Sequence, residues 1–155
     1  MSMLCYLINL WGGCEGYLLH SHQVLKNRAA RSVTGWPRFT STRRLMAACG
    51  WLTVKQLVVF HTVTMVYKTL KSGQPRYLHG RLNTIPHPFR TRQNSTGSIR
   101  QDETLRCKSS LKSDSMRCRG VIEFNRIPAD IRNSPSLATL KKKLKQWVKI
   151  NVDLV

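Results

Sequence analysis

The stretch TVKQLVVFHTVTMVYKTLKSG, residues 53–73, decides the fold. Thr53 and Gln56 have the spacing of a capping box, in which two side chains bind the free backbone amides that begin a helix. Gly73 suits the left-handed conformation that often ends one. The apolar residues in between lie on most sides of a helix, which is typical of a helix that is buried or packs on a partner. We therefore expect a helix over about residues 53–70. The β-branched content also fits a strand, but about seventeen residues is long for a strand.

Two further helices are expected before this one. Over about residues 18–33, apolar side chains recur at steps of three and four, which predicts one helical face. The run TGWP at residues 34–37 ends this helix, because proline blocks its continuation. A shorter helix is expected over residues 42–49, with Gly50 at its left-handed stop. The predicted apolar face of the first helix consists of Leu18, His22, Leu25, Ala29 and Val33.

The second half of the chain has a different texture. Over residues 83–119, prolines, serines and threonines break the periodicity while arginines and lysines recur, which indicates a basic linker or a loose hairpin. The run NSP at residues 133–135 is a helix-start signal. The helix that follows is basic and amphipathic. Its apolar stripe consists of Leu137, Leu140, Leu144, Trp147 and Val148.

These patterns predict a mainly α fold. We expect a small helical bundle, then a basic irregular or hairpin segment, then a C-terminal amphipathic helix. The corresponding divisions are a helical domain over residues 1–82, the basic linker or loose hairpin over 83–119, and a C-terminal segment over 120–155.

The charge is strongly one-sided. The chain has 26 Lys or Arg and 7 Asp or Glu, a net charge of +19, and no acidic residue occurs over positions 16–101. Such self-repulsion destabilises a compact state, which indicates a polyanionic partner, and nucleic acid binding is driven by release of condensed counterions. No apolar run approaches the roughly 20 residues of a membrane-spanning helix. The apolar start, residues 4–11, lacks the basic leading region of a signal peptide. We expect a nuclear or cytoplasmic protein that is not secreted and has no membrane partner.

A series of short motifs runs through the chain in a characteristic order. It begins with YLINLWGGC at residues 6–14 and LKNRAARSVTG at 25–35, continues with GWL at 50–52 and MVYK at 65–68, and ends with RGVIEFNRIP at 119–128 before the lysine-rich helix. This order resembles the C-terminal region of reverse transcriptases from non-LTR retrotransposons of the jockey and chicken-repeat type. The resemblance spans nearly the whole chain.

The resemblance implies a place for this chain after the polymerase palm. Residues 1–82 would then be thumb-like, and a helical thumb holds the primer–template duplex by its backbone. The catalytic aspartates of these RNA-directed DNA polymerases, in a Tyr-any-Asp-Asp turn, have no counterpart in this sequence. The chain is interpreted as a detached fragment or a decayed open reading frame, with the palm as a possible partner.

Catalytic and metal sites have little support in the sequence. Metal sites of polymerases and nucleases need clustered carboxylates, and the seven acids are mostly scattered. Cys14, His20 and His22 lack the paired spacing of a structural zinc site. The five cysteines are odd in number and scattered, which favours reduced thiols. We expect no enzymatic activity, no metal and no cofactor, and we interpret His61 as a core histidine.

Aromatic residues accompany the cations on both sides of the expected 42–49 helix. Trp36, Phe39 and Trp51 lie near several arginines, and aromatics among cations can stack on bases. Alternatively, Trp51 and Phe39 plug the joint between two helices. We favour the plug for Trp51 and leave Trp36 open.

The leading hypothesis is a non-catalytic module that binds RNA or an RNA–DNA hybrid through the phosphate backbone, with little sequence specificity. Lys141 to Lys145 also fit a nuclear import signal. One alternative is a structural or assembly module in which the 53–70 helix packs on a partner polymerase domain, and another is a non-functional retroelement relic. The candidate nucleic-acid-binding residues are Lys26, Arg28, Arg31, Arg43, Arg44, Lys55, Arg90 and Arg92.

Overall fold

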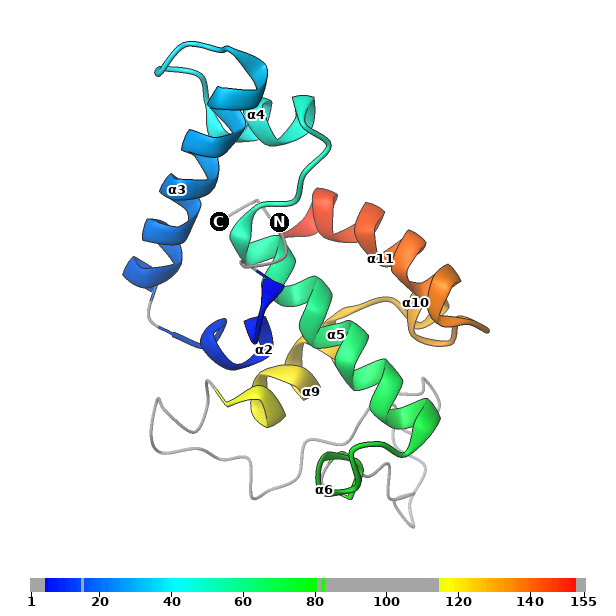
Figure 1. Ribbon diagram of the computed structural model, residues 1–155. Coiled ribbons are helices and arrows are strands. Elements are labelled where there is room, and N and C mark those ends of the chain that lie inside the picture. Colours follow the sequence, from blue (N-terminus) through cyan, green and yellow to red (C-terminus); the bar gives the residue numbers. More distant parts are fainter. Residues whose placement is uncertain (1–4, 15, 81, 83–114, 153–155) are drawn as a thin grey trace.

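The computed structural model describes residues 5–14, 16–80, 82 and 115–152, and all regular structure in these residues is α-helical (Figure 1). The prediction of a mainly α protein is therefore confirmed. Most of the expected basic linker, with Arg90 and Arg92, lies outside the described residues. The helices are α2 (Ile8–Trp11), α3 (Gly16–Thr34), α4 (Thr42–Ala48), α5 (Val54–Ser72), α6 (Arg76–His79), α9 (Met116–Arg126), α10 (Ala129–Arg132) and α11 (Leu137–Asn151).

Helix α5 begins and ends as the sequence predicts. The Thr53 hydroxyl accepts a hydrogen bond from the Gln56 amide at 3.3 Å, and the Gln56 side chain accepts one from the Thr53 amide at 3.0 Å. Gly73 follows the helix with a φ of 69°, in the left-handed region. The capping box and the glycine stop are both confirmed. Together they provide partners for backbone groups that a helix leaves free at its ends.

Helix α5 runs through the middle of the molecule, and α2, α3, α6, α9 and α11 pack on it, while α4 packs on α3 and α10 on α11 (Figure 1). Helix α11 contributes Leu140, Leu144 and Val148, each fully buried, so its predicted apolar stripe is confirmed. Helices α9 and α11, from the expected C-terminal segment, share one hydrophobic core with α5 and with Leu78 and Leu82. Burial of this shared core stabilises the whole arrangement, because the free energy scales with the apolar area removed from water.

Helix α9 occupies residues that the sequence reading assigned partly to the linker and left without a helix. Its start, Met116, lies inside the expected linker, and it continues through Gly120. A Cβ at Gly120 would lie 2.9 Å from Val66 Cγ2, so the missing side chain lets α9 approach α5 closely. Glycine lowers the helix propensity at this position, but the tertiary contact outweighs that cost.

Helix α3 has the predicted extent but buries a different face. Of the predicted stripe, Leu25 and Val33 are 57% and 70% exposed, and only His22 has a ring contact, stacked on Trp11 at 4.9 Å between centroids. The buried residues of α3 are Lys26, Asn27 and Ala30. The prediction of an apolar inward face is therefore wrong. Polar side chains face the rest of the protein, where they bind irregular backbone and the neighbouring helix.

Candidate nucleic-acid interface

Helices α3 and α4 form a joined pair that carries most of the predicted cations. The Asn27 side-chain amide donates a hydrogen bond to Thr42 Oγ at 2.8 Å, which ties the middle of α3 to the start of α4. Ala30, Leu45 and Met46 form a small apolar cluster between the two helices. The residues that follow Asn27 and Thr42 in sequence therefore belong to two helices that are joined to each other.

The cations of this pair are accessible. Arg28 follows Asn27 on α3, and Arg43 and Arg44 follow Thr42 on α4; all three side chains are exposed, and Arg31 is half-buried. Lys55, in the first turn of α5, is also exposed. These residues are named the α3–α4 cation patch: Arg28, Arg31, Arg43, Arg44 and Lys55.

Lys26 does not belong to this patch. Its side chain is 1% exposed, and its ammonium group donates a hydrogen bond to the backbone carbonyl of Leu52. Burial lowers the pKa of Lys26 to about 8, because the charged form loses its hydration. A side chain held this way lies inside the protein and does not contact a phosphate, so the assignment of Lys26 as a nucleic-acid-binding residue is corrected.

No acidic side chain neutralises the patch from within the helices that form it. The sequence has no Asp or Glu between positions 16 and 80, so every charged residue of α3, α4, α5 and α6 is basic. Arg43 and Arg44 lie in the first turn of α4. Cations are unfavourable there, because the helix macrodipole is positive at its N-terminus. An anion beside this turn would reduce the repulsion among the arginines and also their repulsion from the positive end of the helix dipole.

The described acids lie on other helices. Glu123 is on α9 and Asp130 is on α10. Burial raises the pKa of Glu123, while the nearby Arg126 and Arg119 act in the opposite direction. Arg119 also donates a hydrogen bond to the Asn9 carbonyl at 2.9 Å. Arg119 therefore serves a contact within the fold rather than a surface for a polyanion.

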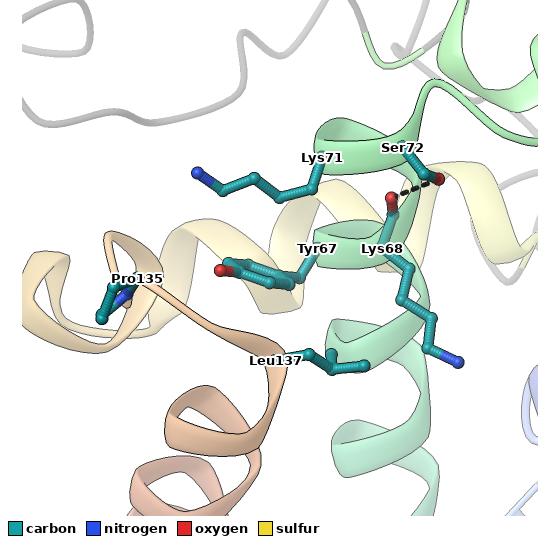
Figure 2. A pocket seen from close by; sticks show the side chains of 6 residues that line it. All are labelled: Tyr67, Lys68, Lys71, Ser72, Pro135 and Leu137. Atoms are coloured by element: carbon teal, nitrogen blue, oxygen red, sulfur yellow. Dashed lines mark hydrogen bonds between the residues drawn. The ribbon is translucent and has the colours of Figure 1, made fainter.

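A second group of cations lies at the C-terminal end of α5. Figure 2 shows a pocket of about 370 Å³ with Lys68 and Lys71 among its lining residues. The Lys71 ammonium lies 6.0 Å from the centre of the Tyr67 ring, and the Tyr67 hydroxyl donates to the Ser134 carbonyl at 2.6 Å. The two lysine side chains extend in opposite directions in Figure 2. They therefore do not converge on one ion.

A larger cavity, of about 550 Å³, has a mainly apolar lining contributed by α2, α5, α6 and α9. Its polar members include His61 and Asn9, and none of the described residues that line it is a lysine or arginine. Burial lowers the pKa of His61, and the charge of Lys141 lowers it further. The cavity therefore differs in chemistry from the cation surfaces and is not part of the candidate interface.

The aromatic residues near the patch divide into two kinds. Trp51 is half-buried and packs on the cluster between α3 and α4, so the expected plug is confirmed for Trp51. Phe39 is 97% exposed, so it does not fill the joint between the two helices. Trp36 is 41% exposed. Sequence spacing alone could not separate these roles, because all three aromatics lie close to the same arginines.

Several exposed cations are not among the residues predicted from the sequence to bind nucleic acid: Arg38, Lys68, Lys71 and the lysines of α11. The signal that could have found the first three was their place in the acid-free stretch. The exposed lysines of α11 are Lys141, Lys142, Lys143, Lys145 and Lys149.

Comparisons with known proteins identify no relative: no family model, no curated protein and no solved structure matches the chain. Within residues 5–14, 16–80, 82 and 115–152, no three His, Cys, Asp or Glu side chains gather as a metal site would require. In the same part of the chain, no helix has the length and hydropathy to cross a membrane.

Proposed function

We propose that this chain is a non-catalytic module that binds RNA or an RNA–DNA hybrid through the phosphate backbone, in the manner that its resemblance to a reverse-transcriptase thumb implies. The observation that carries the proposal is the α3–α4 cation patch. Arg28, Arg43, Arg44 and Lys55 are exposed, and no acid occurs anywhere in the helices that hold them. A nuclear or cytoplasmic location accompanies the proposal, since RNA is present in both.

The physical reason is that a bound polyanion lowers the electrostatic free energy of these cations more than water does. An ordinary basic surface is interspersed with acids, and the resulting ion pairs reduce its potential. The helices that hold this patch contain no acid, so a bound anion can relieve the repulsion among its cations. Each phosphate that a Lys or Arg neutralises releases condensed counterions, which favours binding at low ionic strength.

The proposed contacts give affinity without much sequence specificity. Arginine and lysine side chains on a backbone position the protein but do not read base edges. We therefore expect similar affinities for unrelated sequences of equal length. A module that follows a growing primer–template duplex must bind many different sequences, so low sequence specificity suits this role.

The test is the affinity of the chain for a labelled RNA–DNA hybrid, measured by fluorescence anisotropy over a salt series. The logarithm of the association constant is expected to fall linearly with the logarithm of salt concentration, by about 0.9 for each phosphate neutralised in duplex DNA. Absence of binding at low salt, or affinity that does not change with salt, would contradict the proposal.

A second candidate function is assembly with a protein partner, such as a polymerase palm. Helix α5 no longer supports it, because α5 is buried in the core of this chain. The observation that favours it is the exposed apolar face of α3, where Leu18, Leu25 and Val33 are 38%, 57% and 70% exposed. Exposed apolar patches often mark interaction surfaces. Size-exclusion chromatography with crosslinking of the isolated chain tests this candidate, and a folded monomer would argue against it.

A further inference from the structure

The connection between α3 and α4 holds its aromatic residues away from the protein. Gly35 ends α3 with a φ of 68°, and its amide donates to the Arg31 carbonyl at 2.8 Å. The Thr40 amide then donates to the Pro37 carbonyl at 3.1 Å, which closes a turn with Arg38 and Phe39 at its two central positions. Phe39 is 97% exposed at this turn, and Trp36 is 41% exposed just before it.

This exposure is held in place by local structure. The turn is fixed by its own hydrogen bond and by the helices on both sides, which are joined by the Asn27–Thr42 hydrogen bond. A rigid aromatic ring on a short closed turn loses little conformational entropy on binding. Single exposed apolar residues are common on protein surfaces, so the exposure by itself does not identify a ligand.

The charge around the two rings identifies the class of ligand. Arg38 lies between Trp36 and Phe39 in sequence, and Arg43 and Arg44 follow in the first turn of α4. All three arginines are exposed, and no acid accompanies them. Exposed aromatic rings that alternate in sequence with exposed arginines are complementary to a chain that alternates flat bases with phosphates. A duplex hides its base faces in its own stack, so the matching partner is a strand with unpaired bases.

We propose that the turn with Trp36 and Phe39 is a stacking site for unpaired bases of single-stranded RNA or DNA. Arg38, Arg43 and Arg44 bind the phosphates on either side of the stacked bases. This inference rests on the proposed function, because the same arginines supply the backbone contacts. It adds a preference that phosphate contacts alone do not give: single strands with bases are bound more tightly than single strands of equal charge without them.

The test uses three labelled probes of equal phosphate number: a single-stranded oligonucleotide, the same strand with abasic sites throughout, and a blunt duplex. The variant is Phe39→Ala, with Tyr77→Ala as the control. Tyr77 is 74% exposed on α6, outside the turn. Because Phe39 is almost fully exposed, its replacement removes no buried contact, and circular dichroism of each variant checks the fold.

The expected result is that Phe39→Ala binds the base-bearing strand about tenfold more weakly and leaves both other affinities unchanged. Tyr77→Ala is expected to match the parent protein on all three probes. Equal losses on all probes, or no loss on the base-bearing strand, would overturn the stacking site and leave the rings as a surface for a protein partner. A parent protein that binds none of the probes at low salt would instead contradict the proposed function itself.

Discussion

The Lys26 ammonium group donates a hydrogen bond to the backbone carbonyl of Leu52, in the irregular segment between α4 and α5. Gln23, one turn earlier on α3, accepts a hydrogen bond from the Val54 amide at 2.7 Å. Buried backbone groups outside regular structure need partners, and α3 provides them with polar side chains. The same contacts place α3 against the first turn of α5, so its inward face is polar rather than apolar.

The buried lysine predicts a particular pH dependence of stability. The pKa of Lys26 is about 8 in the folded protein, against an ordinary 10.5. Between these values the unfolded state binds more protons, so the free energy of unfolding rises with pH. Below pH 8 both states are protonated and the contribution is constant. At about 1.4 kcal/mol per pKa unit, the rise from pH 7.5 to 9.5 is about 2 kcal/mol.

Urea unfolding of the parent protein and of Lys26→Met at several pH values measures this effect. The variant keeps the length of the side chain and every other titrating group, so the difference between the two proteins isolates Lys26. The parent protein is expected to gain stability relative to the variant from pH 8 upward. A difference that stays constant with pH would show that the ammonium group is not buried.

Sequence patterns could predict the extent of α3 but not its inward face. Leu18, Leu25 and Val33 recur at helical spacing, and so do Gln23, Lys26 and Asn27 with Ala30. Which of the two stripes turns inward depends on backbone groups near Leu52 and Val54, which are distant in sequence. For the same reason, the sequence analysis placed Lys26 among the surface cations, although this side chain is buried.

The capping box of α5 predicts a difference between two similar substitutions. Thr53→Ala removes a hydroxyl that accepts from the Gln56 amide, and it is expected to lower the free energy of unfolding by about 1 kcal/mol. Ser41→Ala is the matched control, because Ser41 is the N-cap of α4 but makes no side-chain capping bond. Its effect is expected to stay within about 0.5 kcal/mol. Equal losses in the two urea titrations would contradict the role assigned to Thr53.

Because α9 lies close to α5, we expect two glycine-to-alanine substitutions to change the stability of the protein in opposite directions. A Cβ at Gly120 meets Val66 Cγ2 at 2.9 Å, whereas a Cβ at Gly16 has open space around it. Alanine improves helix propensity at both sites by up to about 1 kcal/mol, but overpacking at Gly120 costs about 1–3 kcal/mol. Thermal unfolding should show Gly16→Ala neutral or stabilised and Gly120→Ala destabilised. Stabilisation by both would mean that the two helices lie further apart.

Helix α9 also shows where sequence reasoning was limited by local information. Residues 116–119 fell within the predicted linker, because prolines, serines and threonines break the periodicity over 83–119, and no helix was predicted over 120–126. The close approach of Gly120 is to Val66, more than fifty positions earlier. By contrast, the two ends of α5 and the apolar stripe of α11 were predicted well, since these signals lie within or next to the helices themselves. The start of α11 was predicted too early, at residues 133–135, because its N-cap is Ser136.

Removal of the Tyr67 hydroxyl group is expected to lower the stability of the protein. It donates to the Ser134 carbonyl at 2.6 Å in a buried position, and it links α5 to the segment before α11. Tyr67→Phe leaves that carbonyl without this donor and is expected to cost about 1–2 kcal/mol in urea unfolding. Tyr77→Phe, on an exposed ring of α6, is expected to change stability by less than about 0.5 kcal/mol. A neutral Tyr67→Phe would contradict the hydrogen bond.

The central claim is that the α3–α4 cation patch, rather than the net charge, binds the phosphate backbone. The most direct measurement is the salt dependence of RNA–DNA hybrid binding for two charge-matched variants. One replaces Arg28, Arg43 and Arg44 with alanine, and the other replaces Lys141, Lys142 and Lys145 on α11. All six side chains are exposed, so neither set of changes removes a buried contact. The patch variant is expected to lower the salt slope by about 2–3, at about 0.9 per lost phosphate contact, and the α11 variant by less than about 1. Equal changes in the two slopes would contradict the claim.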